Sequence, residues 1–177
     1  MKSLFITLLI APSILFGQSA KQDSIWKPMK FLTGSWKGIG EGEPGKGNYK
    51  RSYQFILSHN FIEIKNRSTY PATAKHPNGE VHEDIGYMSY DKARKTFILR
   101  QFHVEGFVNQ YKLESISADG TTIIFVSEAL ENIPSGWRAK ETYQLTGTNE
   151  FTETFELAPP NGAYSVYTKT VLKKVGQ

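Results

Sequence analysis

Cysteine is absent from this chain of 177 residues. Its absence excludes a disulfide scaffold, a thiolate nucleophile, and cysteine-based zinc or iron–sulfur sites. A fold without disulfides depends on its hydrophobic core, and a chain of about 150 residues can bury enough surface to form one. Aromatic residues make up 13% of the sequence, which is ample for a core and unlike the composition of a disordered chain.

Long hydrophobic runs are also scarce, and the one clear example, Leu4–Phe16, lies near the N-terminus. Lys2 precedes this run and the small residues Gly17 and Ala20 follow it, which is the order of a secretory signal. A membrane span needs about 20 apolar residues, so the run is short for one. We therefore expect residues 1–20 to be a signal peptide and the protein to be exported, either periplasmic or secreted, without membrane association after cleavage. An uncleaved N-terminal anchor is the alternative.

Runs of one charge are missing, although the formal net charge is +4. Lysines and arginines alternate with acidic residues, so no basic stripe suggests a nucleic-acid partner. No catalytic motif stands out either, because Ser135 lacks the strand–turn–helix context of a nucleophile. We therefore predict no catalytic residue and leave open whether the protein is an enzyme. Four carboxylates are expected on solvated strand faces: Glu128, Glu131, Glu153 and Glu156.

Short extended segments, rich in Thr, Tyr, Phe, Ile and Val, fill the chain beyond its N-terminal region. Most of them alternate between apolar and polar residues, and turn residues such as Asn78-Gly79 and Asp119-Gly120 separate them. The pattern predicts strands at 35–41, 49–57, 61–70, 81–90, 96–104, 107–117, 121–129, 137–145, 151–157 and 164–175.

These segments predict an all-β fold, a ten-stranded antiparallel up-and-down β-barrel that forms a single domain over residues 25–175. Closure removes the two exposed edges that an open sheet would have, and a barrel of this width tends to enclose a cavity. A β-sandwich is the alternative. Ile25–Leu32 has the pattern of one or two helical turns, and we expect it to place Trp26, Met29 and Phe31 as a plug under the barrel.

The first predicted strand carries glycine at every second position, Gly38, Gly40 and Gly42. One face of the strand therefore lacks side chains, which permits close approach of another backbone or of a flat ligand. The spacing differs from that of a dinucleotide-binding loop, and no helix follows. Tight curvature of a barrel strand explains the same glycines without a ligand.

The segment Phe31-Leu32-x-Gly34-x-Trp36-x-Gly38-x-Gly40-x-Gly42 resembles the opening motif of the nitrobindin-like heme-binding β-barrels, relatives of the lipocalin and fatty-acid-binding-protein group. His82-Glu83-x-x-Gly86-Tyr87 is similar to a second motif of that family, and Gln101 stands where the family has a pocket-lining glutamine.

The resemblance implies a barrel with a heme pocket, in which a histidine near the last strand holds the iron. Here the last predicted strand has no histidine, and only Tyr164 and Tyr167 could offer a ligand there. The residues predicted to bind a cofactor are Trp36, Gly38, Gly40, His82, Gln101, His103 and Tyr167.

The histidines support a separate prediction from strand pairing. If Asp91–Arg94 forms a four-residue loop, His82 lies opposite His103, with Asp84 opposite Gln101 on the same face. Directly opposite side chains have Cβ atoms about 5 Å apart. If this face points inward, as the family resemblance favours, it is the polar floor of a pocket. A metal site on the two histidines and Asp84 is a further alternative, without an evident third ligand of suitable geometry.

Three hypotheses about function remain open from the sequence. The first is an exported small-molecule-binding barrel that holds heme or another apolar ligand. The second is a heme enzyme that acts on nitric oxide or peroxynitrite, as the resemblance would imply. The third is a structural or interaction protein with a solid barrel.

Overall fold

A computed structural model of the chain describes residues 23–176. The predicted signal peptide, residues 1–20, lies outside the described residues. Ten antiparallel strands form a closed barrel in which each strand pairs with its neighbours in sequence and β1 pairs with β10, as the sequence predicted. The strands are β1 Gly34–Gly42, β2 Gly47–Ile56, β3 Phe61–Tyr70, β4 Glu80–Asp91, β5 Thr96–His103, β6 Val108–Ile116, β7 Thr122–Glu131, β8 Arg138–Gly147, β9 Glu150–Ala158 and β10 Ser165–Lys174.

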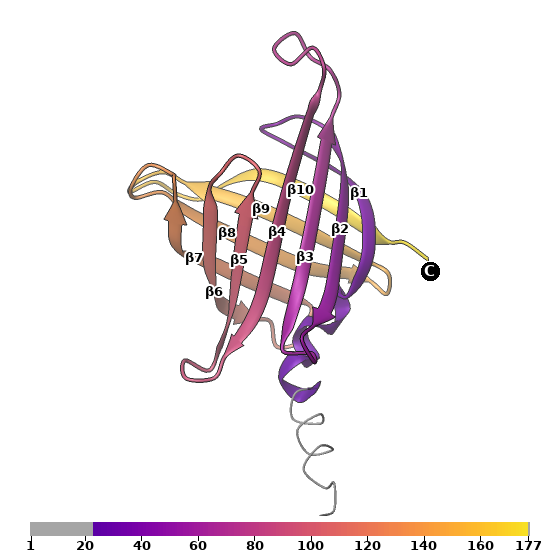
Figure 1. Ribbon diagram of the computed structural model, residues 1–177, viewed down its shortest axis with the longest axis vertical. Coiled ribbons are helices and arrows are strands. Elements are labelled where there is room, and N and C mark those ends of the chain that lie inside the picture. Colours follow the sequence, from indigo (N-terminus) through magenta and orange to yellow (C-terminus); the bar gives the residue numbers. More distant parts are fainter. Residues whose placement is uncertain (1–22, 177) are drawn as a thin grey trace, which may run out of the picture.

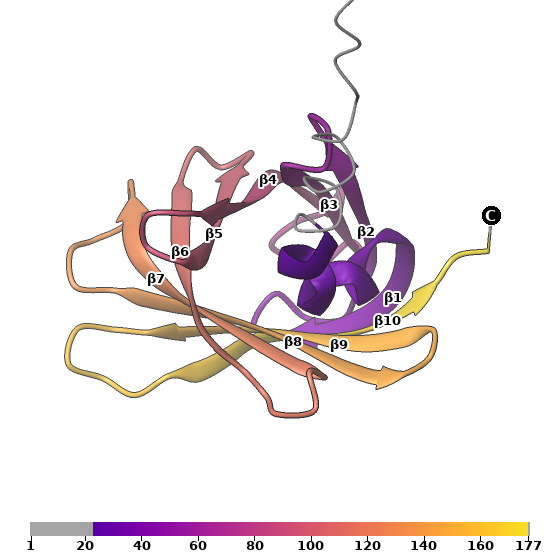
Figure 2. The ribbon, with the colours of Figure 1, turned by 90° about the horizontal axis from the view of Figure 1, so that it is seen from below.

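The barrel is flattened into two layers, with β2 to β5 upright in front and β7 to β10 crossing behind them (Figure 1). The loop between β3 and β4 extends beyond the rest of the barrel at one end. A short helix lies at the opposite end (Figure 2). In the described part of the chain, no helix has the length and apolar character needed to cross a membrane.

The short helix fills the lower end of the barrel, as the sequence predicted. Its main part is a 3-10 helix, η1, over Lys27–Leu32. Met29 and Leu32 are fully buried, and Trp26, immediately before η1, lies against Phe97 with ring centroids 5.1 Å apart. Apolar residues from η1 therefore close this end, and access to the interior is left to the other end.

Alternation along the strands explains which side chains enter the barrel. On β3, Ile62 and Ile64 are buried and point inward, whereas Lys65 points to solvent. Successive side chains of a strand point to opposite faces, so inward positions recur at every second residue. Continuing along β3, Asn66 and Ser68 occupy the next inward positions.

This change from apolar to polar residues recurs on neighbouring strands at the same level of the barrel. Inward positions are apolar near η1 and become polar toward the opposite end. The change runs from Tyr53 to Arg51 on β2, from Met88 to Asp84 on β4, from Leu99 to Gln101 on β5, from Tyr143 to Glu141 on β8, and from Phe151 to Glu153 on β9. The lower half is thus a packed hydrophobic core, and the upper half is a polar interior.

The register of β4 and β5 differs from the prediction, although the predicted face is correct. His103 lies opposite Asp84, not opposite His82, and His82 lies opposite Ser68 of β3. The turn explains the shift, because Asp91 accepts hydrogen bonds from the backbone N–H groups of the residues two and three positions ahead and pairs with Thr96. The loop therefore begins one residue later than predicted. Each β5 residue therefore pairs with a β4 residue two positions away from the predicted one. Because the shift is an even number of residues, every side chain stays on the predicted face of the sheet.

Candidate functional site

The polar upper half of the barrel contains a cavity of about 230 Å³. Its floor and walls carry buried and partly buried polar side chains from seven strands, and aromatic side chains line it toward the open end. The polar lining comprises Arg51, Asn66, Ser68, Asp84, Gln101, His103, Asn109, Glu141 and Glu153, and the aromatic lining near the open end comprises Tyr70, Phe107, Phe155 and Tyr167.

A buried ion pair between Arg51 and Glu153 joins β2 to β9 across the interior. Arg51 Nη2 lies 2.7 Å from Glu153 Oε1, and Arg51 Nε donates to both carboxylate oxygens at 3.1 Å. The Tyr53 hydroxyl donates to Glu153 Oε2 at 3.3 Å. Glu153 is therefore not on a solvated strand face, as the sequence analysis expected. The prediction was wrong because Glu153 stands at an inward position opposite a guanidinium that lies 102 residues away in sequence.

Unsatisfied polar atoms gather around this cavity. Asn66 Oδ1, His82 Nε2, Gln101 Oε1, Asn109 Oδ1 and Glu141 Oε2 are buried without a hydrogen-bond partner, and all five residues line the cavity. Among the described residues, the sixth such atom is the indole nitrogen of Trp26 beside η1. A buried polar group without a partner costs about 1–3 kcal/mol, so their concentration at one place indicates a site whose partners come from a bound molecule.

Burial also changes the protonation of groups around the cavity. It raises the pKa of Asp84 to about 6, against the attraction of Arg51. Burial, together with repulsion from Glu153, raises the pKa of Glu141 well above its ordinary value. Burial lowers the pKa of His103 to about 4, so its imidazole is neutral near pH 7.

Four of the predicted site residues come together here. Gln101 is 4% exposed, and His103 accepts a hydrogen bond at Nε2 from Asn109 Nδ2 at 3.3 Å. His82 lies nearer the open end, where its Nδ1 contacts the carboxylate of Glu105. Tyr167 lines the same end, at a bulge of β10 between Val166 and Thr168.

The other three predicted site residues lie away from the cavity. Trp36 is buried in the lower core, where its indole N–H donates to the backbone oxygen of Leu32 at 2.7 Å. A Cβ atom on Gly38 would lie 2.0 Å from the backbone oxygen of Val171, and one on Gly40 would meet the Tyr49 ring at 2.7 Å. These glycines permit close approach by neighbouring parts of the barrel itself. Their role in cofactor binding stays a prediction.

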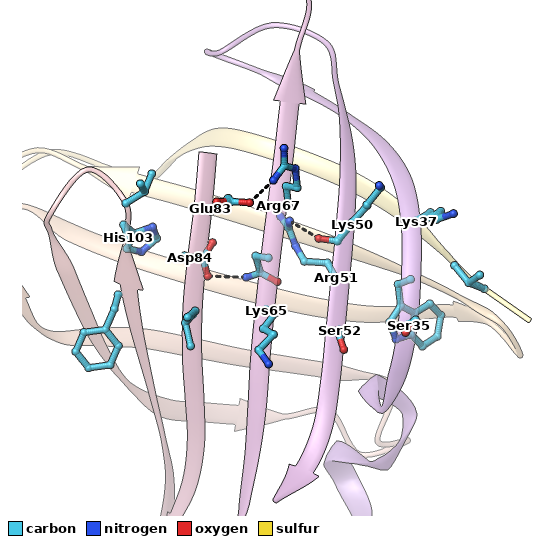
Figure 3. Close-up of a pocket in the computed structure, with 16 residues that line it drawn as sticks. Ser35, Lys37, Lys50, Arg51, Ser52, Lys65, Arg67, Glu83, Asp84 and His103 are labelled. Carbon is cyan, nitrogen blue, oxygen red and sulfur yellow. Dashed lines mark hydrogen bonds and ion pairs between the residues drawn. The ribbon is translucent and has the colours of Figure 1, made fainter. Parts of the chain in front are cut away.

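A second and larger hollow, of about 680 Å³, lies on the outer face of β1 to β5 (Figure 3). Its outward side chains include Lys37, Lys50 and Lys65, and Arg67 forms an ion pair there with Glu83. These groups are exposed to solvent, which satisfies them, and none of the unpartnered buried atoms belongs to an outward-facing side chain of this surface. We therefore take the smaller interior cavity as the candidate site.

Several cavity residues were not identified from the sequence, notably Arg51, Asn66, Asn109 and Glu141. Each occupies an inward position in an alternating strand, but at least one of its two sequence neighbours on the outer face is also polar or charged. Alternation alone therefore could not separate them from solvated positions. The pairing of β2 with β3 could have indicated two of them, because it places Arg51 and Asn66 directly opposite each other.

Iron ligation and heme binding make different demands on this interior. His82 would suit a metal, because its Nε2 has no hydrogen-bond partner and lies 3.9 Å from a Glu80 carboxylate oxygen. Its Nδ1 is held by the Glu105 carboxylate, an arrangement frequent among metal-bound histidines. No three His, Asp or Glu side chains of residues 23–176 are grouped to hold a metal ion by themselves.

The cavity of about 230 Å³ is smaller than the 300–1,000 Å³ typical of pockets for drug-sized ligands, and its floor is charged. The interior therefore does not fit a heme macrocycle.

Comparisons with known proteins agree with the barrel architecture. The family model described as "THAP4-like, heme-binding beta-barrel domain" matches residues 26–174. The crystal structure of Rv2717c from M. tuberculosis aligns with a TM-score of 0.61 at 16% identity, over 86% of this chain and 98% of that one. A de novo designed fluorescence-activating β-barrel aligns over 82% of this chain and 95% of its own at 10% identity, with a TM-score of 0.42. No curated protein matches the sequence.

Proposed function

Because this chain belongs to the family of THAP4-like, heme-binding β-barrel domains, we propose that it is a small-molecule-binding barrel whose interior cavity takes a small polar ligand. The single observation that carries this proposal is the set of five unpartnered buried atoms around one cavity. Natural proteins leave few buried polar groups unsatisfied, and ligands or bound water usually account for those that occur. The N-terminal signal-like segment supports export as a part of the same proposal.

A solid barrel with a purely structural role would have a filled interior. The lower half meets that description, but the upper half combines a cavity with polar atoms that lack partners. Binding of a polar molecule accounts for both features together. A reaction is not part of the proposal, because no cavity residue has the nucleophile–base arrangement that covalent catalysis requires.

Gln101→Leu tests the proposed site. Gln101 Oε1 is buried without a hydrogen-bond partner, so its replacement by an apolar residue of similar size removes a ligand contact without orphaning a partner in the fold. We expect wild-type protein to be stabilised by about 5 °C or more by a ligand at a hundredfold excess over its Kd. The variant should lose most of that shift. The measurement is thermal unfolding of the purified protein with a set of small polar compounds that includes cations, anions and neutral molecules.

The matched control is Gln110→Leu, which changes the same residue type on the outer face of β6, where Gln110 accepts a hydrogen bond from Arg100. This variant should keep the full ligand-induced shift. The proposal fails if no compound of the set stabilises the wild-type protein, or if Gln101→Leu responds as strongly as wild type does.

Heme is the second candidate, favoured by the family and by His82, whose unpartnered Nε2 belongs to the cavity lining. The chain offers iron this one suitable histidine, but the charged floor and the volume of the cavity disfavour the macrocycle. Absorption spectroscopy with added hemin distinguishes heme binding from the binding of a small polar molecule.

A further inference from the structure

Most of the unpartnered atoms of the cavity are hydrogen-bond acceptors, while Glu141 Oε2 belongs to a carboxyl group that accepts when ionised and can donate when protonated. Three of them are side-chain amide oxygens, on Asn66, Gln101 and Asn109. The exposed fractions of these residues are 7%, 4% and 1%, so bulk water does not satisfy them freely. In the tautomer in which His82 Nδ1 donates to Glu105, the lone pair on Nε2 is a further acceptor. A complementary molecule would therefore bring donors.

Two of these amides are hydrogen-bonded through their nitrogen to neighbouring side chains. Asn66 Nδ2 donates to Asp84 Oδ1 at 2.8 Å. Asn109 Nδ2 donates to the Tyr111 hydroxyl at 3.0 Å and to His103 Nε2 at 3.3 Å. Rotating Asn66 would place its oxygen against a carboxylate oxygen, so its amide oxygen is held toward the cavity as an acceptor. The partners of Asn109 accept in the arrangement described, in which its oxygen also faces the cavity.

The charged groups around the cavity also favour a ligand with hydrogen-bond donors, and in particular a positively charged one. Five carboxyl groups, on Glu83, Asp84, Glu105, Glu141 and Glu153, line the cavity together with one guanidinium, on Arg51. Glu83 forms an ion pair with Arg67, and Glu105 contacts His82 Nδ1. Arg51 forms its ion pair with Glu153, while Asp84 accepts a hydrogen bond from the neutral amide of Asn66. Two carboxyl groups are thus left without a salt-bridge partner inside the described barrel. A buried carboxylate is stabilised by an opposite charge within about 4–6 Å.

From these observations we propose that the ligand is a small organic cation with several N–H donors, an amidinium, guanidinium or primary ammonium compound. Its charged group would lie among Asp84, Glu141 and the amide oxygens, and its apolar part would face Phe107, Phe155 and Tyr167 near the open end. The cavity of about 230 Å³ has the volume of about eight water molecules in the liquid, which suits a compound of this size. The inference rests on the proposed function, whose ligand class it names.

Three compounds of nearly identical shape test the inference: benzamidinium, which is cationic, benzamide, which is neutral, and benzoate, which is anionic. Isothermal titration calorimetry of the purified protein at pH 7.5 gives the affinity for each. We expect benzamidinium to bind with a one-to-one stoichiometry and at least about tenfold more tightly than benzamide, because its hydrogen bonds to carboxylates are charge-assisted. Benzoate should show no saturable binding.

Two variants locate the binding. Glu141→Gln removes one unpaired carboxyl group, and we expect it to weaken benzamidinium binding by about tenfold or more while the affinity for benzamide changes little. Glu63→Gln is the matched control, because Glu63 is an outward residue of β3 that contacts Lys65. The control should bind benzamidinium as wild type does. Circular dichroism before each titration verifies that every variant keeps the barrel.

The outcomes separate this inference from the proposed function. If benzoate or benzamide binds more tightly than benzamidinium and Gln101→Leu abolishes that binding, the cationic ligand is excluded while the polar binding site stands. If none of the three compounds binds, the inference is overturned, and the thermal unfolding set decides the proposed function separately. Equal affinities of Glu141→Gln and wild type for benzamidinium would also overturn the inference.

Discussion

Replacing Arg51 with methionine should destabilise the protein by about 3–5 kcal/mol, among the largest effects of any single substitution in the barrel. The guanidinium is the one cation inside the described polar interior, and Arg51 is only 7% exposed. Its removal leaves the Glu153 carboxylate buried without its partner. Urea-induced unfolding at pH 7 measures the loss as a change in the free energy of unfolding.

The control is Arg67→Met, on the outer face of β3. Arg67 forms an ion pair with Glu83, but both side chains are about half exposed. Exposed pairs of this kind contribute about 0–1 kcal/mol, so the control should unfold at nearly the wild-type urea concentration. Similar small losses for both variants would contradict the description of Arg51 and Glu153 as a buried and essential pair.

Glu141→Gln should stabilise the protein, and the gain should grow as the pH rises from 5 to 8. Burial, and then repulsion from Glu153, raises the pKa of Glu141 in the folded state. Above the ordinary carboxyl pKa, the unfolded chain loses this proton while the folded protein keeps it, so the wild-type protein loses stability with rising pH. The slope for one proton is at most about 1.4 kcal/mol per pH unit. Glutamine does not titrate and avoids this loss.

The measurement for Glu141→Gln is the difference in unfolding free energy from wild type at several pH values. Other groups around the cavity titrate as well, with the pKa of Asp84 raised to about 6 and that of His103 lowered to about 4, but both are present in the two proteins. Their contributions therefore largely cancel in the difference. Glu63→Gln, on the outer face of β3, is the control and should differ little from wild type in stability. A gain for Glu141→Gln that is independent of pH would contradict a raised pKa.

A gain in stability together with weaker cation binding would show that Glu141 is kept for binding and not for folding. Binding sites often reduce stability, because their polar groups are arranged for a ligand and stay unsatisfied without it. Arg51 and Glu153 illustrate the opposite case, since each satisfies the other within the protein. The two variants thus separate the groups that hold the interior together from those that await a partner.

Alternation and turn residues were sufficient to predict the strands and the plug. The predicted strand 61–70 coincides with β3, Phe61–Tyr70. Trp26, immediately before η1, and Met29, within it, are buried as expected. These features are local, because they follow from side-chain periodicity and from residues that favour turns. The inward face of β4 and β5 was also predicted correctly, because alternate residues of a strand point to the same face whatever the exact register.

Long-range pairing set the limit of what the sequence could predict. The register of β4 and β5 depends on the side chain of Asp91 within the turn, which shifts the partner of His103 to Asp84. Glu153 was expected on a solvated face because nothing near it in sequence indicates Arg51. The spaced glycines matched a family motif correctly, but Gly38 lies against the backbone of β10 and not beside the cavity. Such roles depend on which strands become neighbours.

Titration with hemin, followed by absorption spectroscopy, tests most directly whether this barrel binds a small polar molecule in place of its family's cofactor. We expect a broad band that does not saturate at one equivalent, with the same spectrum for His82→Ala, because the charged cavity of about 230 Å³ does not fit the macrocycle. A sharp, saturable band at one-to-one stoichiometry that is lost in His82→Ala would contradict it. His82 would then be the axial ligand, and the interior would be a heme site.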